Sequence, residues 1–460
     1  MPRTVLLVMP LILAAPLGAQ SLPQRVAATT AGVVTFSYAT RAGVCGDGYT
    51  IVMDDAQFGG GQIAYSADGS VYTGNWGSMG MARRCDPGPA RVRIMLRDRR
   101  VTNLRPSVGG ATSQPTDRDL GPVAAADAAA YLLDLAATAA DDLGRHALIA
   151  AAIADSARIA PRLTTIARDK SLRPTVREEA LRWVQRTATR DAYETEAQRA
   201  VLGVAGDGDD VVSVRDRAIR VLGHEPSPTT LTWLQTLALN ENEIVALRDR
   251  ALRVLGGETG DPDRVRAVYA RLRHDALKDR AVRLIGAAGD AASERWLLAL
   301  VQDGKEPLAA RDRAIRLLAE QGDYTQLRDL YPRVEESQLK DRIIRVVAEA
   351  GGNDNLRFLR GIVASSSESS AARDRALRTL AQSGLTTADL AGLYDSLPDR
   401  TLRTRVIQLL AERGGEPAFD KLARIAREDP DSDLRRQAAR RLAQSGDPRA
   451  QTFFERTLKN

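Results

Sequence analysis

The stretch Arg-Asp-Arg-Ala-Ile-Arg-Val-Leu, residues 215–222, recurs with few changes along much of this 460-residue chain. The close copies share the pattern of a basic residue, Asp, Arg, two apolar residues, Arg and a final pair that is mostly apolar. Close copies begin at Arg248, Lys278, Arg311, Lys340 and Arg373, and looser copies begin at Arg177, Arg403 and Arg435. An internal repeat of this kind predicts stacked units rather than a single globular core.

The spacing of the copies gives the size of one unit. From Arg215 onward the intervals are 33, 30, 33, 29, 33, 30 and 32 residues. Each interval holds the motif, a Gly-containing break, a second amphipathic segment and another break, which is typical of one helical hairpin. A lone hairpin cannot bury its apolar face, so neighbouring hairpins must stack. We therefore expect a mostly α protein, with a right-handed α-α solenoid of about ten hairpins over residues 124–460 and a closing helix near residues 447–458.

Long and short intervals alternate, and aromatic residues follow the alternation. Trp233, Trp296 and Phe358 each lie 15 residues before the next motif, whereas Tyr269, Tyr331 and Tyr394 each lie 9 residues before it. The true repeat is therefore a module of two hairpins. Duplication of hairpin pairs accounts for this pattern. The alternative is that every second hairpin presents the same binding surface.

The last copy points to a known family. Residues 429–442 (D-P-D-S-D-L-R-R-Q-A-A-R-R-L) combine an Asp-Pro turn with an apolar-Arg pair that opens a helix, and this resembles a HEAT repeat of the short, phycobilisome-lyase type. The resemblance covers about residues 124–460 and implies a scaffold, with the second helix of each hairpin on the concave face. It also implies inter-repeat pairs of Asp429 with Arg435 and of Asp209 with Arg215.

A helical wheel of the Arg248 copy separates the roles of its residues. Arg248 falls inside the apolar arc, so its stem should run along the core and its charge should find a partner. Asp249 and Arg253 are one turn apart and should pair, as should the equivalent residues of the other copies. The third position of each copy lies on the solvent side. These third-position arginines are the candidate partner-binding residues: Arg217, Arg250, Arg280, Arg313, Arg342, Arg375 and Arg405.

Two interpretations of these seven arginines stay open at this stage. Since the guanidinium fork suits carboxylate and phosphate groups, the row could bind a protein or an anionic polymer. Alternatively, each arginine could bridge to an acidic residue of the next hairpin, which a repeat makes easy.

The N-terminus predicts export. Arg3 precedes an apolar stretch that is too short to span a bilayer, and small residues follow, so residues 1–19 read as a cleaved secretory signal. The two cysteines, Cys45 and Cys85, both follow this segment. In an oxidising compartment such a pair should form a disulfide, although two free buried thiols remain the alternative and a metal pair is disfavoured by the scarcity of histidine. We expect a periplasmic or extracellular protein with no membrane span.

Residues 20–108 are predicted to form a small β domain. Residues 33–38 alternate apolar and polar side chains, and short runs at 50–53, 62–65 and 70–76 are broken by turn residues. Residues 91–96 and 100–104 flank a polar turn and read as a hairpin. The polar, Gly- and Pro-containing stretch 109–123 is expected to be a linker to the solenoid.

Catalytic and cofactor motifs are not visible in the sequence. The three histidines are scattered, so no metal site and no cofactor are expected. The net charge of +6, from 65 basic and 59 acidic residues, is weak support for a polyanionic partner. Export argues against nucleic acid. The leading hypothesis is an exported scaffold that binds a protein or anionic macromolecule. The rivals are an enzyme or small-molecule binder, with its site in the β domain or at the junction with the solenoid, and a purely structural envelope component.

Overall fold

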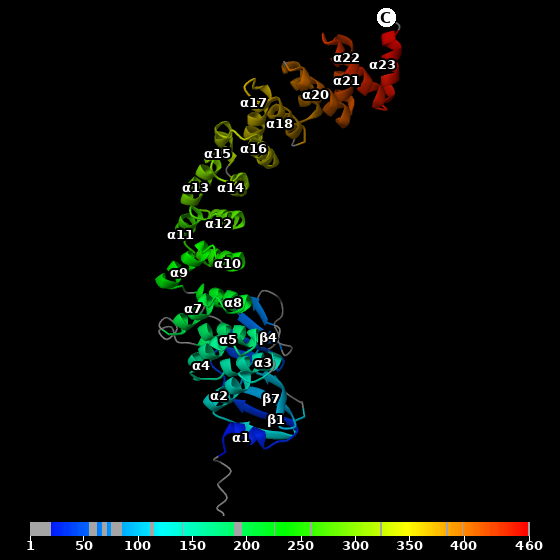
Figure 1. Cartoon of the computed structure of the whole chain (residues 1–460). Helices are drawn as coiled ribbons and strands as arrows, with labels where there is room; N and C mark the ends of the chain where they lie inside the picture. The colour runs from blue at the N-terminus through cyan, green and yellow to red at the C-terminus, as the bar shows by residue number, and fades with distance from the viewer. Residues whose placement is uncertain are drawn as a thin grey trace, which may run out of the picture. The chain divides into compact units, whose positions relative to one another are not determined.

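The computed structural model describes residues 20–54, 62–66, 71–74, 85–110, 115–139, 141–187, 196–224, 226–257, 260–322, 324–382, 385–397 and 399–458. The expected secretory signal, residues 1–19, lies outside these residues. The chain divides into two compact units, Met1–Val254 and Leu255–Asn460. The first contains the β structure and the first helices, and the second contains the remaining helices (Figure 1).

The β structure forms two sheets within the described residues. One sheet has the strand order β8-β7-β1-β9 and the other β5-β4-β3-β2-β6. Neighbouring strands are antiparallel except β1 and β9, which are parallel. The strands are β1 (Gly32–Tyr38), β2 (Val44–Gly46), β3 (Thr50–Asp54), β4 (Gln62–Ser66), β5 (Val71–Gly74), β6 (Asp86–Pro87), β7 (Ala90–Arg97), β8 (Arg100–Ser107) and β9 (Arg118–Pro122).

The predicted hairpin is the centre of the first sheet. β7 and β8 are joined by Asp98 and Arg99, which have φ angles of 51° and 61°. Positive φ at both central residues is typical of the tight turn whose twist matches a hairpin. β9 lies within residues 109–123, the stretch for which the sequence predicted a linker.

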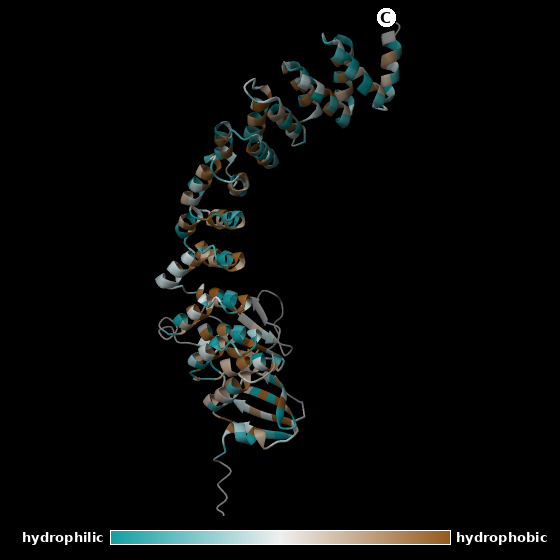
Figure 2. Ribbon diagram, viewed as in Figure 1, coloured by the Kyte–Doolittle hydropathy of each residue, from teal (hydrophilic) through white to brown (hydrophobic). Residues whose placement is uncertain are grey.

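One face of this sheet is buried against the first helices. Apolar residues alternate with polar ones along β1 and β7, so the apolar set points to one side (Figure 2). Phe36 packs edge-on against Tyr131 of α2, with ring centroids 6.3 Å apart. The Tyr38 hydroxyl donates to the Ala150 carbonyl of α3 at 2.5 Å, and the Arg41 amide donates to the Ile153 carbonyl at 3.0 Å. The sheet and the first helical pair therefore share a core.

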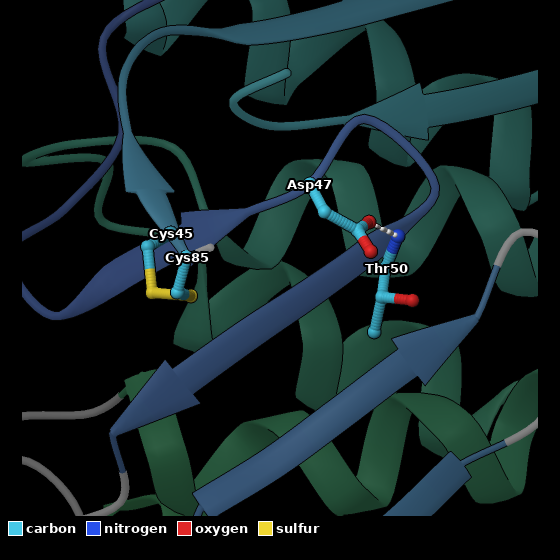
Figure 3. Close-up of a disulfide and its surroundings, with 4 residues drawn as sticks. All are labelled: Cys45, Asp47, Thr50 and Cys85. Atoms are coloured by element: carbon cyan, nitrogen blue, oxygen red, sulfur yellow. Dashed lines mark hydrogen bonds between the residues drawn. A yellow bond between two sulfur atoms is a disulfide. The ribbon is translucent and has the colours of Figure 1, made fainter. Parts of the chain in front are cut away.

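The disulfide predicted from the two cysteines is confirmed. Cys45 in β2 is bonded to Cys85, immediately before β6, and β2 and β6 are paired (Figure 3). The bond fastens the edge of the second sheet. In the following loop, the Asp47 carboxylate accepts from the backbone amides of Tyr49 and Thr50 at 2.9 and 2.7 Å.

The helices form consecutive antiparallel pairs, which confirms the hairpin prediction. A short helix, α1 (Leu22–Ala27), precedes β1, and α23 (Pro448–Leu458) is the predicted closing helix. The pairs, ten in the described residues as predicted, are α2 (Ala125–Ala136) with α3 (Asp141–Ala152), α4 (Ala160–Arg168) with α5 (Pro174–Thr187), α7 (Gln198–Gly206) with α8 (Val212–Leu222), α9 (Pro228–Leu239) with α10 (Val245–Leu255), α11 (Pro262–Tyr269) with α12 (Asp275–Ala287), α13 (Ala291–Gln302) with α14 (Leu308–Glu320), α15 (Tyr324–Leu330) with α16 (Ser337–Ala350), α17 (Asn353–Ala364) with α18 (Ser370–Gln382), α19 (Thr387–Ser396) with α20 (Arg400–Arg413), and α21 (Glu416–Glu428) with α22 (Ser432–Gln444).

The motif copies lie on the second helix of each pair, from α5 to α22, and we call these the motif helices. In α10, Leu247, Ala251, Leu252 and Leu255 are fully buried, as the helical wheel predicted. Within the second unit each motif helix packs on the next, from α12 through α22. The apolar half of each motif thus forms one continuous core along the repeats.

The first arginine of five motif copies is buried and bound to its surroundings; these residues are Arg177, Arg215, Arg248, Arg311 and Arg373. In each of them Nε donates to a backbone carbonyl ten residues earlier, as from Arg248 to Ala238 at 3.0 Å. In four of them the guanidinium also meets an acidic residue in the loop of the following pair. These ion pairs are Arg177 with Asp210, Arg215 with Glu243, Arg311 with Glu336, and Arg373 with Asp399.

The pairings implied by the HEAT resemblance are therefore wrong for this chain. Arg215 pairs with Glu243 and not with Asp209. Arg435 donates to the backbone carbonyl of Asp429 at 2.6 Å, while the Asp429 carboxylate accepts from the Tyr394 hydroxyl. The buried arginine reaches forward to the next hairpin because its stem already lies between the two helices of its own pair.

The alternation of modules has a packing explanation. In two of the three short units the motif opens with lysine, and Lys278 lies over the Tyr269 ring, 4.9 Å from its centroid. Lys278 and the Tyr269 hydroxyl both bind Glu306, at 2.8 and 2.7 Å. Trp296 of the following long unit packs edge-on against the same ring.

The next module repeats this cluster residue by residue. Lys340 lies over the Tyr331 ring, both residues bind Glu368, and Phe358 packs edge-on against Tyr331. Lysine, tyrosine and the aromatic ring are thus one packing unit, and the alternation reflects the core.

Candidate functional site

The third-position arginines predicted from the sequence lie along the motif helices and are mostly half-buried. Five of the seven form ion pairs with the second-position aspartate of the preceding motif helix. These are Arg250 with Asp216 at 2.6 Å, Arg313 with Asp279 at 3.0 Å, Arg342 with Asp312 at 2.5 Å, Arg375 with Asp341 at 3.1 Å, and Arg405 with Asp374 at 2.7 Å. The acceptor is thus on the preceding motif helix, whereas the alternative interpretation placed it on the next hairpin.

Arg217 differs from these five. It forms no hydrogen bond or ion pair within the described part of the chain, and its Nε is buried without a partner. Burial first, and then the charges of Arg182 and Arg220, lower the pKa of its guanidinium. Arg217 is therefore half-buried, with Arg182, Arg220, Glu178 and Glu179 as its charged neighbours.

The sixth position of the motif carries a second row of arginines. The expected pairing with the aspartate one turn earlier is confirmed for Arg220, Arg253, Arg283, Arg316 and Arg378, at 2.5 to 2.9 Å. Their side chains are 40–45% exposed, against 24–39% for the five paired third-position arginines. The remaining member, Arg345, is exposed and forms no hydrogen bond or ion pair within the described residues.

The two rows share their acidic partners. Asp312, for example, accepts from Arg316 of its own helix and from Arg342 of the next motif helix. Asp216, Asp279 and Asp374 are each shared in the same way. One carboxylate therefore serves two guanidinium groups. We call the surface formed by these arginines and aspartates in α12, α14, α16, α18 and α20 the motif-helix face. It has nine such arginines and four such aspartates, so the arginines are in excess.

Among the shared aspartates, Asp312 is held in its charged form by the two arginines that it contacts. Burial alone would raise the pKa of Asp312, but hydrogen bonds and charge from Arg342 and Arg316 outweigh it and lower the pKa. In the same way, contacts with Arg177 and Arg215 outweigh burial and lower the pKa values of Asp210 and Glu243.

These shifts predict loss of stability in acid. A carboxyl group whose pKa is lower in the folded chain stabilises the fold above its ordinary pKa, about 4, and that contribution is lost as the pH falls through the folded value. We expect the thermal midpoint to be nearly constant from pH 8 to about 5 and to fall steadily below about 4. Circular dichroism melts across this range would measure it. A midpoint that held or rose down to pH 3 would contradict the expectation.

A hollow of about 340 Å³ in the second unit is lined by residues of α14, α15 and α16. Arg316, Glu320 and Glu349 supply its charges, and Tyr324 and Val346 supply apolar surface. A hollow with this mixed lining is suited to one side chain of a partner. Within the described residues, no group of three or more histidine, cysteine, aspartate or glutamate side chains is placed to hold a metal ion.

The sequence predicted the sixth-position arginines only as partners of the aspartate one turn earlier. That the same aspartate also binds an arginine of the next motif helix was not predicted. The motif itself held the missing signal, since it contains two outward arginines for each aspartate.

Comparison with known proteins identifies the repeats. Residues 390–460, from within α19 to the end of the chain, match the family model described as HEAT repeats. Residues 390–460 are HEAT repeats. The same helical pairs continue upstream through the earlier motif helices, which confirms the predicted solenoid and the small β region that precedes it. A HEAT solenoid suggests a protein-interaction scaffold.

A solved structure titled "Circular tandem repeat protein with novel repeat topology and enhanced subunit contact surfaces" is also similar in part. The match has 15% sequence identity and covers 70% of this chain and 62% of that protein. Its TM-score of 0.10 is too low to indicate a shared architecture. No curated protein matches the chain. Among the described residues, no helix combines the length and apolar character needed to cross a membrane.

Proposed function

We propose that this chain is an exported scaffold whose HEAT repeats bind an acidic segment of another protein along the motif-helix face. The observation that carries the proposal is the sharing of one aspartate between two arginines, repeated along the motif helices. Internal pairing orients the guanidinium groups without neutralising the surface. In Arg316 Nη2 donates to Asp312 and Nε is buried, so the remaining Nη hydrogens are the donors available to a carboxylate.

The spacing of the repeats defines the kind of segment that fits. Packed helices lie about 10 Å apart, and a chain in the polyproline II conformation advances about 3.1 Å per residue with three residues per turn, so every third side chain lies on one face. An acidic side chain at every third residue would therefore meet successive sixth-position arginines. The third-position arginines hold the shared aspartates in place, and the sixth-position arginines make the contacts.

A binding experiment on the second unit tests the proposal. The sixth-position arginines Arg283, Arg316, Arg345 and Arg378 are changed together to glutamine, which keeps good helix propensity. The probe is a fluorescent peptide with glutamate at every third residue. We expect at least about fourfold weaker binding, because four exposed charge pairs contribute about 0.2–1 kcal/mol each. Fluorescence anisotropy measures the affinity, and added salt should weaken the wild-type complex.

The matched control removes the same charge from the opposite helices of the pairs. Arg295, Arg357, Arg360 and Arg424 are exposed residues of α13, α17 and α21. Their replacement by glutamine should leave peptide affinity unchanged. If both variants lost the same peptide affinity, net charge would explain the binding, and the motif-helix face would not be a specific binding surface. Binding of heparin but not of the peptide would show that the partner is an anionic polymer, against the protein partner proposed.

Export is the second part of the proposal. It is supported by the sequence of residues 1–19 and by the Cys45–Cys85 bond, since such bonds persist in oxidising compartments. The partner would then be a periplasmic or extracellular protein.

A further inference from the structure

The first sheet has a hollow of about 420 Å³ on the face that does not pack against the helices. The residues that alternate with the buried ones line it, and three of them are the arginines Arg91, Arg93 and Arg105. A volume of this size accepts a small ligand about as large as a monosaccharide. The sequence pattern R-V-R-I at residues 91–94 already places Arg91 and Arg93 on one side of a strand.

Strand register brings the positive charges together. Arg93 of β7 lies directly opposite Arg105 of β8. Like charges in directly opposed positions of an antiparallel pair are destabilising. On its other side Arg93 faces Thr35 of β1, and Thr35 in turn is paired with Asp119 of β9. Charge repulsion is therefore concentrated at the Arg93–Arg105 pair.

Neither of these two arginines is neutralised by the protein. Nη2 of Arg93 donates to the Pro115 carbonyl at 3.1 Å, and its Nε is buried without a partner. Arg105 forms no hydrogen bond or ion pair within the residues that the structure describes. Asp119 is the acidic residue of the lining, and its Oδ1 accepts from Thr35 at 3.1 Å and from the Gly121 amide at 3.0 Å.

The loop that carries Tyr49 is held by hydrogen bonds and places this aromatic side chain at the edge of the hollow. Tyr49 lines the hollow and is 65% exposed. The loop that carries it is closed by Asp47, whose carboxylate accepts from the Tyr49 and Thr50 amides (Figure 3). The Gly48 amide donates to the Val108 carbonyl at 3.0 Å and ties the loop to the residue after β8. An exposed phenol held beside arginines offers a flat face for a ring.

We propose that this hollow binds a small, ring-containing ligand through an oxyanion group, either a carboxylate or a phosphate. The guanidinium groups of Arg93 and Arg105 donate hydrogen bonds to the oxyanion, and its negative charge offsets the repulsion between the two arginines. Asp119 and the hydroxyls of Thr35 and Ser37 contact the polar remainder, against Tyr49. This site is separate from the motif-helix face and does not depend on the proposed scaffold function.

Titration calorimetry on the full mature chain tests the site, with glucuronate and glucose 6-phosphate as charged probes and glucose as the neutral probe. We expect binding of at least one charged probe and none of glucose. The probe that binds identifies the oxyanion as carboxylate or phosphate. Arg93→Gln and Arg105→Gln should each weaken binding about tenfold or more, because hydrogen bonds to a charged group are lost. Asp119→Asn should strengthen it by removing the opposing charge.

Arg100→Gln is the matched control, since Arg100 is an exposed residue of the same strand and lies outside the lining. It should bind like the wild type. Thermal melts without ligand keep the test independent of folding: Arg105→Gln should melt at the wild-type temperature or above it, because repulsion is removed. Absence of binding by both charged probes, equal binding of glucose, or an equal loss in Arg100→Gln would overturn the proposal.

Discussion

Replacement of Arg177 by methionine is expected to lower the free energy of unfolding by about 3–5 kcal/mol. Arg177 and Asp210 are both 3% exposed, and the guanidinium makes a two-pronged contact with the carboxylate. Nε also donates to the Ala167 carbonyl at 2.9 Å. The substitution leaves a buried carboxylate without its counter-charge, which costs far more than the lost contact itself. Urea unfolding would measure the difference, and hydrogen exchange of α5 and α8 would locate it.

Two further variants separate this explanation from a general packing defect. Arg162→Met breaks an exposed pair with Asp134 in the same unit, and exposed pairs contribute at most about 1 kcal/mol. The double variant Arg177→Met/Asp210→Leu replaces both charges by apolar groups and should recover most of the stability. If the double variant were as unstable as Arg177→Met, the buried unpaired charge would not be the cause.

The repeat architecture could be predicted from the sequence because each motif encodes its own helix. Leu247, Ala251, Leu252 and Leu255 define a buried stripe whatever lies beside it, and repetition supplies the neighbour. The burial of Arg248 followed from the same wheel. Local pairs such as Asp312 with Arg316 were predictable because they depend only on helical spacing.

The partners of the buried arginines could not be predicted in the same way. Arg177, Arg215 and Arg311 reach acidic residues that are 33, 28 and 25 positions further along the chain. Which acid meets the guanidinium depends on the length and turn geometry of each loop, and these vary from one hairpin to the next. The sharing of Asp312 by Arg316 and Arg342 depends on how adjacent helices stack, which no single repeat encodes.

The hollow in the β region was beyond prediction for a related reason. The face of β7 that carries Arg91 and Arg93 followed from alternation alone. The position of Arg105 opposite Arg93 depends on the register between β7 and β8. The position of Tyr49 at the hollow depends on a loop from the other sheet. Contacts between distant segments are set by the folded chain and leave no periodic signal.

Replacement of both cysteines by alanine is expected to lower the free energy of unfolding of the first unit by about 4 kcal/mol, on the chain-entropy model. The bond joins residues that are 40 positions apart, so its loss frees a long loop in the unfolded chain. β2 and β6, which it fastens, pair over only two residues each and cannot keep the sheet edge closed alone. Urea unfolding of the oxidised wild type and of the double variant would measure the effect.

Reduction with dithiothreitol supplies the control. It should lower the free energy of unfolding of the wild type by as much as the double substitution does, and it should leave that of the double variant unchanged. Hydrogen exchange should rise in β2, β3 and β6, whereas amides of α14 and α16 should keep their protection, since each repeat is stabilised by its immediate neighbours. Equal stability of the oxidised and reduced wild type would show that the sheet edge is held by packing alone. In that case the bond would not stabilise the fold. Its support for export would then come only from the fact that disulfides persist in oxidising compartments.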